Sequence, residues 1–87
     1  MYFHGTLEER NGEQEYTHNF LIKAKNEKAA EERLDLEARQ FYSGDIYIDD
    51  GGYYFEDGTI FVEAGSLTLT TKKEFVDNLL STHLITT

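Results

Sequence analysis

Residues 1–23, MYFHGTLEERNGEQEYTHNFLIK, decide how the fold begins. The dipeptide Asn11-Gly12 separates two runs in which side chains alternate along the chain. Asn-Gly is the strongest short signal for a two-residue hairpin turn, because both residues tolerate a positive φ. With this pair as the loop, Phe3 faces Phe20, and the apolar residues of both runs share one face. The stretch therefore predicts a β-hairpin with one apolar face.

The next stretch, Asn26–Tyr42, changes to the period of an amphipathic helix. Asn26 is a favoured N-cap residue, and Ser43-Gly44 supplies a stop after the stretch. The apolar stripe of this helix consists of Ala30, Leu34, Ala38 and Phe41. We expect this stripe to pack on a sheet.

Three more turn signals, Asp50-Gly51, Asp57-Gly58 and Ala64-Gly65, divide the following residues into four short strands. With two-residue loops at these points, one face collects apolar and aromatic residues only: Ile46, Ile48, Tyr53, Phe55, Ile60, Val62, Leu67 and Leu69. The other face collects Asp45, Tyr47, Asp49, Tyr54, Glu56, Phe61, Glu63 and Thr68. This clean separation supports the predicted pairing of the strands.

Residues 71–82 predict a second, shorter helix. Thr71 and Glu74 form a capping box, and the apolar stripe consists of Phe75, Val76, Leu79 and Leu80. The predicted element order is ββαββββα, and 87 residues are enough for one domain, 1–87, with a single core. We expect an α+β fold, in which both helices pack on the apolar face of an antiparallel sheet.

The composition limits the classes of function. With 8 Lys and Arg against 17 Asp and Glu, the net charge is −9, which disfavours direct binding to nucleic acid. The absence of Cys excludes disulfides, thiol nucleophiles and cysteine-based metal sites. No run approaches the roughly 18 apolar residues of a membrane span, and the first residues do not resemble a signal peptide. We expect a cytoplasmic protein that does not bind membranes.

Sequence patterns for catalysis and metal binding are missing. The chain has no G-x-S-x-G motif, no glycine-rich phosphate loop and no D-x-D-x-D-G calcium loop. His4 and His18 point to opposite faces of the predicted hairpin and His83 lies near the other terminus, so the three do not form a zinc site. His18, expected opposite Gly5, fills the space over that glycine. We expect no enzyme activity, no cofactor and no metal.

The polar face of the later strands gives the first candidate site. Tyr47, Tyr54 and Phe61 face one another across three neighbouring strands, and carboxylates border them: Asp45, Asp49, Glu56 and Glu63. Aromatic rings within an acidic rim suit an Arg or Lys of a protein partner. Asp45 and Glu56 are expected directly opposite each other, which is unfavourable unless a cation or a basic group of a partner lies between them. Alternatively, the rings only stabilise the sheet, or the second helix or a second copy of the chain, in a homodimer, covers them.

The first helix gives the alternative binding site. Glu27, Glu31 and Asp35 follow one another at i, i+4 spacing, about 6 Å per step. Leu36 lies on the side away from the core stripe, where an apolar residue can contact a partner.

In size, charge and layout the whole chain resembles the small, acidic, phage-encoded anti-defence proteins of the anti-CRISPR type. Many of these are single α+β domains that block a nucleic-acid-handling complex. The two carboxylate rows carry the resemblance, and no motif does. It implies that carboxylates about 6 to 7 Å apart stand in for successive phosphates in a basic groove. We therefore expect a non-enzymatic module that binds a basic protein surface; the alternative is a small cytoplasmic domain whose acidity serves solubility.

Overall fold

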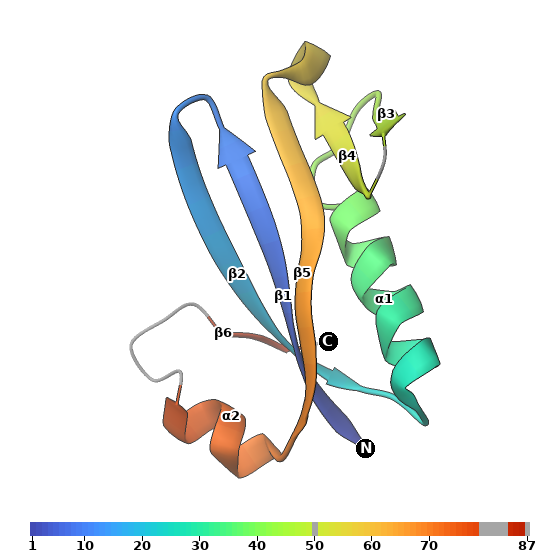
Figure 1. Ribbon diagram of the computed structural model, residues 1–87, viewed down its shortest axis with the longest axis vertical. Coiled ribbons are helices and arrows are strands. Elements are labelled where there is room, and N and C mark those ends of the chain that lie inside the picture. The colour runs from blue at the N-terminus through green and yellow to red at the C-terminus, as the bar shows by residue number, and fades with distance from the viewer. Residues whose placement is uncertain (50, 79–83, 87) are drawn as a thin grey trace.

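A computed structural model of the chain, which describes residues 1–49, 51–78 and 84–86, confirms the α+β class. Its sheet has the strand order β3-β4-β5-β1-β2-β6 (Figure 1), and β6 pairs with β2 in parallel whereas the other neighbouring strands are antiparallel. The elements in chain order are β1 (Tyr2–Asn11), β2 (Gln14–Lys23), α1 (Glu27–Arg39), β3 (Tyr47–Asp49), β4 (Gly52–Phe55), the 3₁₀ turn η1 (Glu56–Gly58), β5 (Ile60–Thr70), α2 (Lys72–Asn78) and β6 (Leu84–Thr86).

The first hairpin forms where predicted, but its register differs by two residues. Phe3 pairs with Ile22 rather than with the predicted partner Phe20. The loop consists of Gly12 and Glu13 instead of Asn11 and Gly12, and Gly12 takes the positive φ of +63°. Glycine adopts this conformation at less cost than asparagine, which explains the shift of the loop. Because a shift of two residues leaves the alternation of side chains unchanged, the predicted apolar face is correct.

The registers predicted for the two shorter strands are confirmed. Tyr47 pairs with Tyr54, and Tyr54 pairs with Phe61. Between β4 and β5, however, the chain forms η1 instead of a two-residue loop, and two residues of η1 other than glycine have positive φ. The strands therefore end one pair earlier than predicted.

The turn predicted at Ala64-Gly65 is wrong, because β5 is one continuous strand that pairs with β1. A β-bulge lies between the pairs made by Gly5 and Leu7 and adds one residue to β5. After the extra residue, each side chain of β5 lies on the face opposite to the one that strict alternation would give it. A two-residue hairpin turn at this point would have the same effect. This is why Leu67 lies on the predicted face although the predicted turn does not exist.

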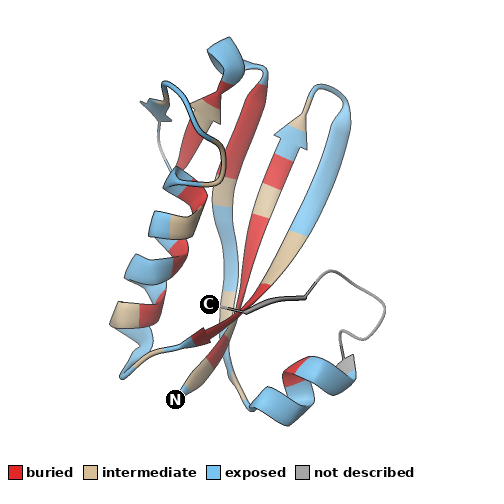
Figure 2. Ribbon diagram, turned by 180° about the vertical axis from the view of Figure 1, so that it is seen from behind, coloured by how far each residue is buried: buried red, intermediate tan, exposed pale blue. Residues whose placement is uncertain are grey.

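The core lies between α1 and one face of the sheet (Figure 2). The side chain of Asn26 accepts a hydrogen bond from the backbone N–H of Ala29, which caps the helix as predicted. Ala30, Leu34 and Ala38 are buried as predicted. The helix ends at Arg39, before the predicted end at Tyr42, and the two aromatic residues that follow pack half-buried against the core.

α2 packs on the opposite face of the sheet, which corrects the prediction that both helices cover one face. Phe75 is 3% exposed and its ring meets that of His4 edge-on, with 5.2 Å between centroids. His4 points away from the core because its neighbour Phe3 points into it. α1 already covers the core face. On the opposite face, this end of the sheet presents the side chains of His4 and the buried Leu21. Thr71 accepts the predicted capping hydrogen bond from the backbone N–H of Glu74.

Part of the predicted second helix, Leu79 to Thr82, lies outside the described residues, as do Asp50 and His83. Within the described ranges, no helix is long and apolar enough to cross a membrane.

Candidate functional site

The candidate site lies on the sheet face opposite α1, which we call the outer face. Directly paired residues of five strands place one row of side chains across it: Tyr47, Tyr54, Phe61, Arg10 and Glu15. A second row runs beside the first and contains Asp49, Gly52, Glu63, Glu8 and Thr17. The predicted aromatic row is therefore one part of a longer row that continues onto the first hairpin.

The aromatic end of the outer face is only partly open. Tyr47 is 59% exposed, Tyr54 is half-buried and Phe61 is 8% exposed. The rings of Tyr54 and Phe61 are 4.6 Å apart between centroids. Phe61 also fills the space over Gly52, where a Cβ would lie 2.4 Å from its Cζ. Neighbouring side chains thus cover Phe61, so the open part of the aromatic row consists of Tyr47 and part of Tyr54.

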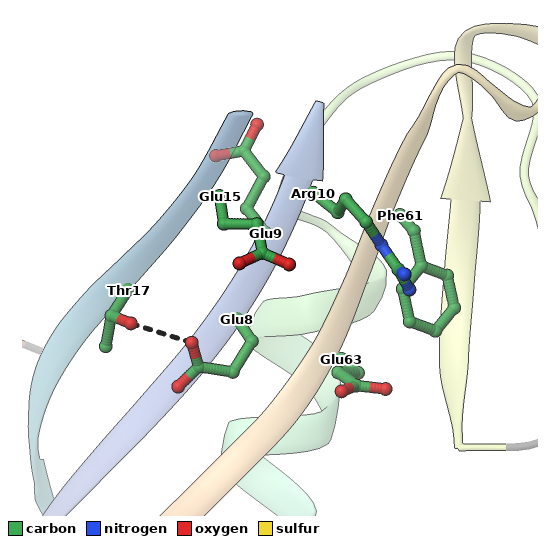
Figure 3. Close-up of a pocket in the computed structure, with 7 residues that line it drawn as sticks. All are labelled: Glu8, Glu9, Arg10, Glu15, Thr17, Phe61 and Glu63. Carbon is green, nitrogen blue, oxygen red and sulfur yellow. Dashed lines mark hydrogen bonds between the residues drawn. The ribbon is translucent and has the colours of Figure 1, made fainter. Parts of the chain in front are cut away.

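Carboxylates gather beside the aromatic rings. Glu8 and Glu63 are directly paired across β1 and β5, and the hydroxyl of Thr17 donates a hydrogen bond to Oε2 of Glu8 at 2.7 Å. With Glu15 and Arg10 they surround an open cavity of about 500 Å³ (Figure 3). Like charges directly opposite each other are unfavourable in a sheet. The arrangement leaves room between the carboxylates for a cationic group.

Two of the other predicted rim residues lie elsewhere. Asp45 precedes β3, Glu56 lies in η1, and both are exposed. They do not face each other across paired strands, because β3 begins only at Tyr47. Instead they line a second, shallow cavity of about 200 Å³. Asp49, in contrast, is exposed at the end of β3, two residues from Tyr47 and on the same face of the sheet. Of the predicted carboxylates, Asp49 and Glu63 lie beside the aromatic row, and Glu63 also lines the larger cavity.

The alternative site on α1 loses one of its members. Both carboxylate oxygens of Asp35 accept the hydroxyl of Tyr53, at 2.7 and 2.8 Å. This hydrogen bond raises the pKa of Tyr53 and ties α1 to β4. Glu27 and Glu31 are exposed, and Leu36 is 40% exposed. Of the three predicted carboxylates, Glu27 and Glu31 are therefore free of this role, whereas Asp35, although exposed, holds the tyrosine hydroxyl.

A buried carboxylate, which the sequence analysis did not identify, lies on the core face. Glu9 is 5% exposed. Its Oε1 lies 2.7 Å from Nε2 of His18, and its Oε2 accepts a hydrogen bond from the hydroxyl of Tyr42. The ring of Phe41 packs on His18 with 4.7 Å between centroids. The histidine pairs with Leu7 rather than with the predicted glycine. The cluster fastens the segment after α1 to the first hairpin.

The contact of Tyr42 with Glu9 makes the stability of the fold sensitive to pH in the alkaline range. The hydrogen bond to Glu9, aided by burial and by the carboxylate charge, raises the pKa of Tyr42 to about 12. In the unfolded chain the phenol titrates near its ordinary value of about 10. The stabilisation is therefore complete below about pH 10 and is lost as the pH rises to about 12.

We expect the urea midpoint of Tyr42→Phe to fall less steeply between pH 10 and 12 than that of the unsubstituted chain. Tyr47→Phe, which changes an exposed phenol, is the matched control and should follow the unsubstituted chain. Equal slopes for all three proteins would show that the Tyr42 phenol does not carry this pH dependence.

In the part of the chain that the structure describes, no group of three or more His, Asp or Glu residues is arranged to hold a metal ion. Comparison with known proteins gives no match: no family model fits the chain, and no curated protein or solved structure is significantly similar to it.

Proposed function

We propose that the chain is a non-enzymatic, acidic protein-binding module that acts in the cytoplasm and binds a basic surface of another protein through its outer face. The direct pairing of Glu8 with Glu63 beside the aromatic row carries this proposal. Their mutual repulsion is a cost for the free protein. A basic side chain of a partner between them would remove that cost and would gain charge-assisted hydrogen bonds.

The charge and the aromatic residues would act at different stages of binding. A net charge of −9 steers the chain towards basic partners and increases the rate of encounter. Tyr47 and Tyr54 offer large rings with a polar hydroxyl, a residue type that often anchors protein interfaces. Electrostatic attraction would thus bring the surfaces together, and the tyrosines would slow their separation.

The partner class we propose is a nucleic-acid-binding protein, such as a component of a host defence complex. A surface that neutralises phosphates carries clustered Lys and Arg. Glu8, Glu15 and Glu63 present carboxylates around one open cavity, where such side chains can bind. The chain would then block nucleic acid from that surface, as the anti-defence proteins that it resembles do. It would not bind nucleic acid itself, because its charge repels phosphates.

The test measures binding kinetics with a basic partner that the chain retains from a lysate at low salt. Reversing Glu8 and Glu63 together to Lys should slow association and flatten its salt dependence, because such charges act mainly on encounter. Tyr54→Ala should speed dissociation, because it removes an anchor.

The matched control reverses Glu27 and Glu31 on α1 to Lys, which changes the net charge equally. Asp35 is left intact because it holds Tyr53. If only the helix pair weakens binding, the site lies on α1 and the outer-face proposal is wrong. If neither pair has an effect, the acidity serves solubility.

A further inference from the structure

We infer that Arg10 occupies the cation-binding position of the outer face in the free protein, and that an arginine of the partner displaces it on binding. The inference rests on the proposed function and names the chemistry of the side chain that the site takes. Arg10 is the single basic residue among those that line the larger cavity. It is therefore an internal competitor for the group that the cavity would bind.

The position of the Arg10 side chain supports this inference. Its guanidinium lies over the ring of Phe61, with Cζ 5.3 Å from the ring centroid, which is a cation–π contact (Figure 3). Arg10 and Phe61 are direct partners across β1 and β5. Phe61 is only 8% exposed, although it lies on the open face of the sheet. Part of this cover is the side chain of Arg10, which is long, flexible and itself exposed.

Arg10 has a second partner within reach. Glu15 is its direct neighbour on β2, on the side away from Phe61. Yet the two ion pairs found among the described residues are His18 with Glu9 and Arg33 with Glu37, so Arg10 contacts the ring instead of a carboxylate.

Because Arg10 contacts the ring of Phe61 rather than Glu15, displacing Arg10 from the ring costs little free energy. When a partner's guanidinium takes the place over Phe61, Arg10 can turn towards Glu15 and form an ion pair there. One cation–π contact is then exchanged for another, and a new ion pair is gained. An arginine fits this place better than a lysine, because a planar guanidinium stacks on a ring.

The experiment measures the affinity of a labelled octa-arginine peptide by fluorescence anisotropy at fixed ionic strength. Arg10→Gln should bind about two- to fivefold more tightly than the matched control Lys28→Gln, which removes the same charge from the exposed surface of α1. In a Phe61→Leu background, Arg10→Gln should give no such gain over Lys28→Gln, because the ring for which the two guanidinium groups compete is gone. Far-ultraviolet circular dichroism confirms that each variant is folded.

The outcomes separate the two proposals. If the unsubstituted chain binds the peptide and the two glutamine variants gain equally, Arg10 acts only through its charge; the inference is then wrong and the proposed function stands. A gain that persists without the Phe61 ring would also overturn the inference. If no protein binds the peptide, both proposals fall.

Discussion

Replacing Phe55 by alanine is expected to lower the free energy of unfolding by about 3–5 kcal/mol, the cost of removing a large buried ring. Phe55 is fully buried, and its ring packs edge-on against Tyr42 with 5.6 Å between centroids. The side chain also belongs to the cluster that joins α1 to the sheet. The substitution would leave a cavity among the buried side chains of this cluster. Urea unfolding at neutral pH measures the loss.

The neighbouring residue provides a matched control. Tyr54 lies on the outer face and is half-buried, so Tyr54→Ala should cost clearly less than Phe55→Ala. An equal loss at both positions would mean that the outer face is as closely packed as the core. The outer face would then be an unsuitable binding surface, so this measurement also bears on the proposed function.

Replacing Glu9 by alanine is expected to cost about 2–4 kcal/mol. Breaking a buried charged contact by removing one partner typically costs about 3–5 kcal/mol. The lower range applies because the His18 side chain keeps 20% of its surface exposed and can turn to water. The Tyr42 hydroxyl loses its acceptor as well. The loss is measured by urea unfolding at neutral pH.

Thr17→Ala is the control for Glu9→Ala, because it removes an exposed hydrogen bond to the neighbouring Glu8. Its cost should stay within about 0.5 kcal/mol. In a double-mutant cycle, Tyr42→Phe should cost less when Glu9 is already alanine than in the unsubstituted chain. Strict additivity of the two substitutions would contradict the coupling described for this cluster.

Local sequence signals predicted local structure well. The cap at Asn26, the register of β3 with β4 and the division of side chains between two faces each depend on residues close together in the chain. The pairing of β1 with β5 could not be predicted in this way. A bulge and a two-residue turn change the alternation of side chains equally, so the pattern around Gly65 fits both.

The same limit applies to the candidate site. The row of Tyr47, Tyr54 and Phe61 follows from hairpin registers and was therefore predictable. Arg10 and Glu15 join that row, and Glu8 comes to lie beside Glu63, only through the pairing of β1 with β5. Glu9 shows a related limit. A carboxylate in an otherwise apolar position is a visible anomaly, but only the folded chain brings Tyr42 to it.

The continuous strand β5 also has a consequence for how the protein is made. The strand pairing of the first hairpin and the turns of α1 lie within residues 2–39, so these elements can form early during synthesis. β1 acquires its second neighbour only when residues 60–70 have left the ribosome. Contacts between distant parts of a chain form slowly. Until then the hairpin carries an unpaired edge, which can pair with other chains. The nascent chain is therefore most prone to aggregation between the synthesis of α1 and that of β5.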